Sequence, residues 1–139
     1  MDLFPNYPTL DRDAVAKIDS LALAYVGDAV QTLYVRSLLL GQNAGQSAGK
    51  LHRLTIGKVS AAAQAEQADR VLPLLSEEER DVYRLARNHK TGSSAKNATV
   101  GDYHKASGLE AVWGYLYLTG QTDRLNELLA IAIQDKEQL

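Results

Sequence analysis

The sequence of 139 residues has the length of one ordinary domain, and 45% of its residues are hydrophobic, enough for a single core. It contains no cysteine, which excludes disulfides and thiolate chemistry, and no apolar run approaches the roughly 18–20 residues of a membrane span. The first ten residues have neither the basic nor the apolar region of a signal peptide. We therefore expect a cytoplasmic protein that does not associate with membranes.

Charge is unevenly distributed along the chain. The formal net charge is −2, so the molecule as a whole is not an obvious binder of nucleic acid. Residues 47–65, however, contain Lys50, Arg53 and Lys58 and no acid, and residues 84–105 contain five Lys or Arg residues against a single acid. A basic face on an acidic protein is one explanation of this pattern, and ordinary solvated helix faces are the other.

The chain is expected to begin with an irregular segment. Pro5 and Pro8 disfavour regular structure, so residues 1–17 are predicted to form an N-terminal arm. Asp19 or Ser20 is suited to cap the first helix, because a short side-chain oxygen can accept a hydrogen bond from the free backbone N–H groups of the first turn.

The rest of the sequence predicts helices separated by polar turns. Ser76 and Glu79 form a capping box, Gly120 is suited to end a helix, Thr122 is suited to cap the last one, and residues 90–98 are predicted to be a polar loop. No segment shows the alternation of a strand. The pattern predicts an all-α protein with about six to seven helices. Their expected ranges are 20–40, one or two helices within 47–75, 77–88, 100–119 and 123–136.

The predicted helix 20–40 carries an aspartate on a mixed face. Asp28 lies opposite the aliphatic residues and among both polar and apolar neighbours, as is typical of a cleft or a subunit interface. Gly27 precedes it, and a glycine in a helix interior costs about 1 kcal/mol relative to alanine. We therefore expect another backbone or a ligand to approach closely there. The residues expected to face the core are Leu23, Val26, Val30, Leu33 and Leu40.

The predicted helix 100–119 carries a glutamate in a similar setting. Val112 and Leu116 are expected to face inward, and Glu110 lies opposite them. Ser107 and Gly114 flank Glu110, and their small size leaves room for an ion or a phosphate group near the carboxylate.

The two carboxylates allow more than one interpretation. Carboxylates on facing helices can bind Mg²⁺, which takes few protein oxygens and keeps several waters. Helical periodicity also allows the simpler interpretation that Asp28 is solvated or paired with Arg36, and that Glu110 is an ordinary helix former.

Two segments resemble the signature motifs of the ribonuclease III family. Residues 24–30 (AYVGDAV) are similar to its first motif, a hydrophobic pair followed by Gly-Asp-Ala/Ser and an aliphatic residue. Residues 109–118 (LEAVWGYLYL) resemble the second, a glutamate followed by Ala, an aliphatic pair, Gly and an apolar stretch. Further matches, in the same order, are to the Mini-III ribonucleases. They fall at residues 21–25, 34–36, 59–61, 64–65, 87–88, 90 and 96–97.

The resemblance extends over nearly the whole chain and implies a function. It implies a ribonuclease III-type helical endonuclease domain, here residues 18–139, that forms a homodimer and cuts both strands of double-stranded RNA. The implied cofactor is Mg²⁺, with Mn²⁺ as a substitute, and Asp28 and Glu110 are the implied catalytic and metal-binding residues. For the Mini-III subgroup, the implied substrate is the precursor of large-subunit (23S) ribosomal RNA, and a ribosomal protein or pre-ribosomal particle is a further implied partner.

The sequence departs from the family pattern at two positions. Full-length relatives have a glutamate four residues before the aspartate, where this chain has Ala24, and an aspartate three residues before the glutamate, where it has Ser107. The resemblance to the Mini-III subgroup, which tolerates such losses, keeps the prediction of activity and leaves the number of ions open. The double-stranded-RNA-binding domain that usually follows is also missing from these 139 residues. RNA binding is therefore expected to rest on the catalytic domain or on RNA already folded on a partner.

Basic side chains are candidates for phosphate contacts, because double-stranded RNA is recognised mainly through its shape, phosphates and 2′-hydroxyls. The candidates are Lys50, Arg53 and Lys58 in one set, and Arg84, Arg87, Asn88, Lys90, Lys96 and Asn97 in the other. No role is assigned to His52, His89 or His104, which show no catalytic spacing. The helix setting of Tyr25, Trp113, Tyr115 and Tyr117 favours packing in the core or in a dimer interface.

Two other functions compete with the enzyme. The losses at Ala24 and Ser107 suit a noncatalytic helical RNA-binding module with a degenerate metal site. A helical interaction protein with no affinity for RNA is the third possibility.

Overall fold

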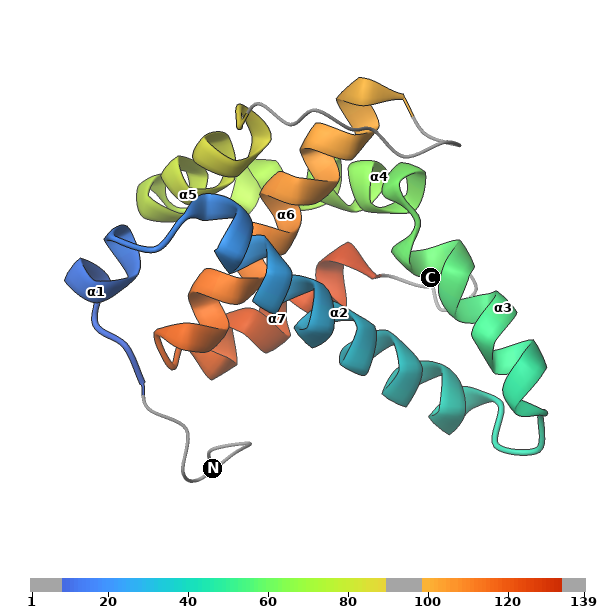
Figure 1. Cartoon of the computed structure of the whole chain (residues 1–139). Helices are drawn as coiled ribbons and strands as arrows, with labels where there is room; N and C mark the ends of the chain where they lie inside the picture. Colours follow the sequence, from blue (N-terminus) through green and yellow to red (C-terminus); the bar gives the residue numbers. More distant parts are fainter. Residues whose placement is uncertain (1–8, 90–98, 134–139) are drawn as a thin grey trace.

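The computed structural model describes residues 9–89 and 99–133, and the fold in these ranges is helical throughout (Figure 1). This confirms the predicted all-α class with six to seven helices. The elements are α1 (Arg12–Ala16), α2 (Ser20–Gln42), α3 (Ala48–Val59), α4 (Ala61–Val71), the 3₁₀ turn η1 (Leu72–Leu74), α5 (Glu77–Arg87), α6 (Val100–Leu118) and α7 (Thr122–Ala132).

Helix α6 is the centre of the structure, and α2, α4, α5 and α7 pack around it (Figure 1). From Ala106 to Leu116 every residue is buried except Glu110, which keeps partial access to solvent. A helix that is apolar on all sides is stable only inside a core, so α6 has to be enclosed by its neighbours. Val112 and Leu116 lie fully inside, as predicted.

Helices α2 and α6 cross at two glycines. A Cβ atom placed on Gly27 would lie 1.6 Å from the carbonyl oxygen of Glu110 and 2.8 Å from the backbone nitrogen of Gly114. A Cβ atom on Gly114 would lie 2.0 Å from the carbonyl oxygen of Leu23. The two backbones are therefore in direct contact, which confirms the prediction that Gly27 marks the close approach of another chain segment.

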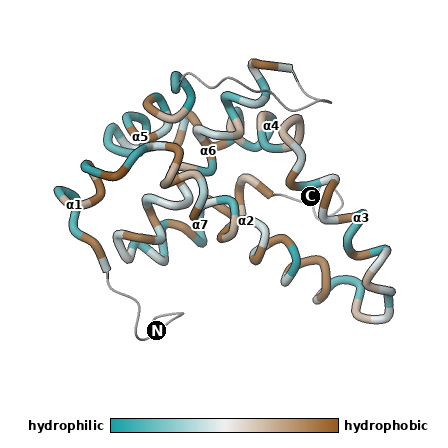
Figure 2. Tube along the Cα trace, viewed as in Figure 1, coloured by the Kyte–Doolittle hydropathy of each residue, from teal (hydrophilic) through white to brown (hydrophobic). Residues whose placement is uncertain are grey.

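The predicted core face of α2 is partly wrong. Leu23 is buried, Val26 and Val30 are half-buried, and Leu33 and Leu40 are 50% and 53% exposed. Apolar residues occur along the whole of α2 (Figure 2), so periodicity alone did not define its inner side. The crossing with α6 defines it instead, because only small residues allow the backbones to meet. The buried residues of α2 are Leu23, Ala24, Gly27, Gln31, Val35 and Leu39.

The helix ends agree with the sequence in most places. The capping box of Ser76 and Glu79 forms as predicted, and Gly120 follows α6 with φ of +72°, a left-handed conformation that suits glycine. Asp19 is the N-cap of α2, but its side chain makes no capping hydrogen bond. For α7 the prediction was one residue late, since Gln121 is the N-cap and Thr122 is the first helical residue.

Helix α1 lies within the segment that was predicted to be irregular. Its N-cap, Asp11, accepts a hydrogen bond at 2.8 Å from the backbone nitrogen of Ala14, and Val15 is buried in the core. One capped turn that buries a single valine is too short for periodicity to reveal. Within the described ranges, no helix is long and apolar enough to cross a membrane.

The crossing predicts a large difference between two glycine substitutions. Gly27→Ala forces its methyl group into the backbone of Glu110, and we expect it to lower the free energy of unfolding by roughly 3 kcal/mol or more. This corresponds to a fall of roughly 10 °C in the midpoint of thermal unfolding, measured by circular dichroism. Gly57→Ala is the control, because no atom lies within 4 Å of its Cβ position in α3, and it should stabilise by about 0.5–1 kcal/mol. Equal midpoints for the two variants would contradict the close crossing.

Candidate metal and RNA-cleavage site

Asp28 and Glu110 lie side by side because the crossing fixes the residues next to it. Gly27 touches the backbone of Glu110, and Asp28 directly follows Gly27 in α2. The carboxyl groups of Asp28 and Glu110 are within hydrogen-bonding reach of each other. Asp28 is exposed, whereas Glu110 is largely surrounded by packed atoms. The structure therefore brings together the two carboxylates that the sequence predicted as a pair, and it shows no Asp28–Arg36 ion pair among the described residues.

Glu110 binds a proton unusually tightly. Burial raises the pKa of its carboxyl group to about 9, to which the hydrogen bond and the negative charge of Asp28 also contribute, while a hydrogen bond from Gln64 acts in the opposite direction. At neutral pH the carboxyl group of Glu110 is therefore protonated in the metal-free protein. A cation placed between the two groups would displace this proton.

The carboxylate pair fits a hard divalent cation with a small protein ligand set. No group of three or more His, Cys, Asp or Glu side chains within the described ranges can hold a metal ion together. Ala24 and Ser107, each about one turn before a carboxylate, are both buried and add no charge. A site of two carboxylates suits Mg²⁺, which commonly takes one or two protein carboxylates and completes its shell with water and phosphate oxygens.

A group of buried amides beside Glu110 was not singled out from the sequence. Gln31 of α2 and Gln64 and Gln67 of α4 are 0%, 3% and 4% exposed. Gln64 and Gln67 share the inner face of α4 with Ala68 and Val71. Two glutamines at core positions of an amphipathic helix were the available signal, because a buried amide requires hydrogen-bond partners.

The first set of predicted RNA-binding residues lies on α3, which packs against α2 and α4. Lys50 and Arg53 are exposed and Lys58 is half-buried, and none of them makes an ion pair among the described residues. Their positive charge is therefore not neutralised by carboxylates of the described ranges. Whether they contact RNA stays a prediction.

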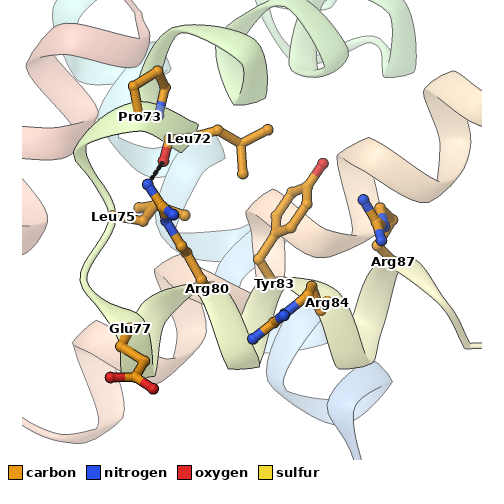
Figure 3. A pocket seen from close by; sticks show the side chains of 8 residues that line it. All are labelled: Leu72, Pro73, Leu75, Glu77, Arg80, Tyr83, Arg84 and Arg87. Carbon is orange, nitrogen blue, oxygen red and sulfur yellow. Dashed lines mark hydrogen bonds between the residues drawn. The ribbon is translucent and has the colours of Figure 1, made fainter.

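Arg84 and Arg87 of the second set lie in a hollow of about 600 Å³ on α5 (Figure 3). Arg84 pairs with Asp81, and the guanidinium of Arg87 lies 5.7 Å from the centre of the Tyr83 ring. The hollow is lined by Leu72, Pro73, Leu75, Glu77, Arg80, Tyr83, Arg84 and Arg87.

This hollow and the carboxylate pair face different sides of α6. The Tyr83 ring meets α6 at Gly108, where an added Cβ would lie 2.7 Å from it. Glu110 is two residues further along α6, which is about 200° around the helix axis. Arg84 and Arg87 are thus not gathered at the carboxylate pair. Asn88 is exposed at the end of α5, and Lys90, Lys96 and Asn97 lie outside the described residues.

The histidines have ordinary surroundings in the structure. His52 is exposed on α3. The Nε2 atom of His89 lies 3.5 Å from a carboxylate oxygen of Asp19, and the ring of His104 packs edge-on against Tyr103. These contacts give no reason to assign the histidines a catalytic role.

Known proteins resemble this chain over nearly its whole length. The family described as "Ribonuclease III domain" matches residues 21–121. The chain belongs to the ribonuclease III family. It is 40% identical to the Mini-ribonuclease 3 of Thermoanaerobacter sp. (strain X514) over 138 residues, which are 99% of this chain and 96% of that protein. The Mini-ribonuclease 3 of Enterococcus faecalis is 44% identical over 117 residues, which are 81% of this chain and 86% of the relative.

The fold agrees with a solved structure of moderate sequence similarity. A crystal structure of a protein from Fusobacterium nucleatum matches with a TM-score of 0.78 and 29% identity, covering 90% of this chain and 98% of that one. The chain is thus a ribonuclease III-type endoribonuclease, and its Mini-ribonuclease 3 relatives confirm the subgroup that the sequence motifs indicated. Asp28 and Glu110 both fall within the segment matched to the ribonuclease III domain.

The raised pKa of Glu110 predicts a pH-dependent gain in stability for Glu110→Gln in metal-free protein. Because the folded-state pKa of about 9 lies above the ordinary value of 4.5, Glu110 destabilises the fold progressively as pH rises from about 4.5 to about 9. Glutamine cannot ionise and avoids this loss. With a chelator present, we expect similar unfolding midpoints at pH 4.5 and a midpoint about 3 °C or more higher for the variant at pH 8.5, equivalent to about 1 kcal/mol.

The exposed Glu66 supplies the control for this experiment. Its side chain is 74% exposed. The difference in unfolding midpoint between Glu66→Gln and wild type should therefore be the same at pH 4.5 and at pH 8.5. A Glu110→Gln variant whose midpoint follows that of wild type at both pH values would contradict a proton held on Glu110.

Proposed function

We propose that this protein is a Mg²⁺-dependent endoribonuclease for double-stranded RNA, with Mn²⁺ as a possible substitute, and that Asp28 and Glu110 are its catalytic metal ligands. The observation that carries the proposal is the meeting of these carboxylates at the α2–α6 crossing, where Asp28 is exposed and burial beside Asp28 raises the pKa of Glu110. Membership of the ribonuclease III family supports the reaction class, and the names of the Mini-ribonuclease 3 relatives support the subgroup.

Asp28 and Glu110 have different roles in the proposed site. Asp28 and Glu110 would hold the ion, which supplies Lewis acidity and lowers the pKa of bound water for attack on a phosphodiester. Asp28 is exposed and faces the solvent from which RNA arrives. Glu110 is half-buried on the central helix α6, and its backbone carbonyl touches Gly27, so the crossing sets the position from which its side chain reaches Asp28. Ala24 and Ser107 supply no further carboxylate, so water and substrate oxygens would complete the ligand set.

Basic residues outside the site account for RNA binding in the proposal. Double-stranded RNA offers regularly spaced phosphates, and Lys or Arg side chains that contact them give affinity that falls as salt concentration rises. Lys50, Arg53 and Lys58 form the first surface, on α3. The second surface includes Arg84, Arg87 and Asn88 of α5, which can meet RNA only where the bound RNA extends beyond the carboxylate pair.

The proposed biological substrate is precursor 23S ribosomal RNA in the cytoplasm, as the resemblance to the Mini-III subgroup implies. We also propose that an RNA already folded on a ribosomal protein or in a pre-ribosomal particle presents its duplex to the catalytic domain.

A cleavage assay tests the enzyme against the noncatalytic RNA-binding module. We expect wild-type protein to cut a labelled RNA duplex with Mg²⁺ and to be inactive with chelator. Asp28→Asn and Glu110→Gln should each lower the rate by at least roughly 100-fold, because each removes one of two metal-binding carboxylates. Asp123→Asn, at an exposed position of α7, is the control that should cut like wild type.

The competing functions predict different results in the same assay. A noncatalytic module would bind the duplex in a salt-dependent manner but cut no faster than Asp28→Asn with Mg²⁺ or Mn²⁺. A helical interaction protein would show no affinity for RNA at any salt concentration.

We further propose that α2 forms the interface of a homodimer. Tyr25, Leu33 and Leu40 are 81%, 50% and 53% exposed and lie within about 80° of one another around the helix. This apolar stripe runs along the same helix as Asp28, so a second copy packed on it would place two carboxylate pairs in one particle. Two sites in one particle suit a reaction that cuts both strands of a duplex.

The dimer predicts a change in mass on one substitution. Wild-type protein should have twice the mass of the 15.2 kDa chain by light scattering coupled to gel filtration. Leu33→Lys places a charge in the apolar stripe and should yield a monomer at the same concentration. Leu85→Lys, at a residue of α5 that is 68% exposed, is the control and should remain a dimer. If wild-type protein were still monomeric when measured at a concentration 100-fold higher than in the first experiment, the proposed interface would be contradicted.

A further inference from the structure

Three glutamines and a tryptophan form a closed hydrogen-bonded cluster between α2, α4 and α6. The Nε2 atom of Gln31 donates to Oε1 of Gln67 at 2.9 Å, and Nε2 of Gln67 donates to the backbone carbonyl oxygen of Lys58 at 2.7 Å. The Oε1 atom of Gln31 accepts from Nε1 of Trp113 at 3.0 Å and from Nε2 of Gln64 at 3.3 Å. The cluster thus connects the end of α3 with the centre of the core.

The direction of every amide in this cluster is determined by two groups that have only one possible role. The carbonyl of Lys58 can only accept a hydrogen bond, so Gln67 must present its NH₂ group to it and its oxygen to Gln31. The indole N–H of Trp113 can only donate, so it must meet the oxygen of Gln31. Both requirements give Gln31 the same orientation, which leaves its oxygen facing Gln64.

Gln64 must therefore present its NH₂ group, and not its oxygen, toward the cluster and toward Glu110. One N–H of this group is directed at the oxygen of Gln31, and the amide also makes a hydrogen bond with the carboxyl group of Glu110. Gln64 is only 3% exposed, so solvent cannot replace this donor. The N–H donor that faces Glu110 is thus held in its orientation by groups on three other helices, α2, α3 and α4.

We propose that Gln64 is a positioning residue for metal binding, which holds the carboxylate of Glu110 by an N–H donor whose direction is set through Gln31 by Trp113 and Lys58. This inference rests on the proposed metal site at Asp28 and Glu110. An N–H donor stabilises an ionised carboxylate and restricts its rotation, so Glu110 is oriented for binding a cation. Since Ala24 and Ser107 contribute no carboxylate, the orientation of Glu110 matters more here than in a four-carboxylate cluster.

The hydrogen bonds of Gln64 distinguish this role from ordinary core packing. The oxygen of Gln31 keeps its shorter bond to Trp113 when Gln64 is removed, so the rest of the cluster survives. Removal of Gln67, in contrast, leaves both Nε2 of Gln31 and the carbonyl of Lys58 without these partners. Gln67 is therefore the more important of the two for the cluster, and Gln64 is the one that contacts Glu110.

The experiment compares Gln64→Met with Gln67→Met, since methionine has nearly the same length and shape as glutamine. Binding of Mn²⁺ to RNA-free protein is measured from the loss of the electron paramagnetic resonance signal of the free ion. We expect Gln64→Met to bind Mn²⁺ 10–100-fold more weakly than wild type, as is typical when a group that supports a metal ligand is lost. Gln67→Met should bind within about threefold of wild type, although it should unfold at an equal or lower temperature, because Trp113 keeps Gln31 and Gln64 in place.

The outcomes separate this inference from the proposed function. Equal Mn²⁺ affinity for wild type and Gln64→Met, or equal weakening in the two variants, would overturn the positioning role and leave the metal site intact. Absence of Mn²⁺ binding to wild type would overturn both. If circular dichroism shows that Gln64→Met does not fold, Gln64→Asn replaces it. Asparagine keeps the amide but withdraws it by one methylene, and a weaker affinity than that of Gln67→Met is again the expected result.

Discussion

The contact between the backbones of α2 and α6 is the constraint on which the rest of the structure depends. Gly27 and Gly114 leave no space for a side chain between the two helices, and a single methyl group at either glycine would overlap with the opposite backbone. The closeness of Asp28 and Glu110 follows directly, because one is the neighbour of Gly27 and the other contributes the carbonyl that Gly27 touches. The same backbone contact thus determines both the packing of the core and the position of the site.

The second constraint is electrostatic. An enclosed glutamate beside an aspartate is unfavourable when both are ionised, and the protein without metal relieves this by keeping a proton on Glu110. The site is consequently less stable at alkaline pH until a cation takes the place of the proton. The hydrogen bond from Gln64 lowers the pKa of Glu110. The cluster behind Gln64 is buried and held together by hydrogen bonds, so the fold determines the surroundings of Glu110.

The sequence was sufficient for the features that depend on local pattern or on motif order. The all-α class, the capping box at Ser76, the glycine at 120, the close approach of another backbone at Gly27, and Asp28 and Glu110 as carboxylates on facing helices were all predicted. The inner face of α2 was not, because Leu33 and Leu40 are as apolar as the buried Leu23 and Leu39. Which side of such a helix is buried depends on its partner helix. For α2 the buried side is the one with Gly27, because this glycine allows the backbone of α6 to come into contact.

Other features of the site could not be derived from one sequence. The cluster consists of polar residues at core positions, Gln31, Gln64 and Gln67. Its hydrogen bonds connect residues that are 33 and 36 positions apart along the chain, on α2 and α4. Arg84 and Arg87 of α5 were predicted to bind RNA from the charge pattern alone, which does not show on which side of α6 they lie. The structure separates Arg84 and Arg87 from the carboxylate pair, because Gly108, which meets Tyr83, and Glu110 are two residues apart on α6 and face nearly opposite sides.

Anomalous diffraction from crystals soaked in Mn²⁺ tests the central claim most directly, namely that the α2–α6 crossing builds a metal site from two carboxylates. We expect one strong peak per chain between the carboxyl groups of Asp28 and Glu110, with water completing the coordination. A direct hydrogen bond between the two carboxyl groups with no peak at saturating Mn²⁺, or a peak held by other residues, would contradict it.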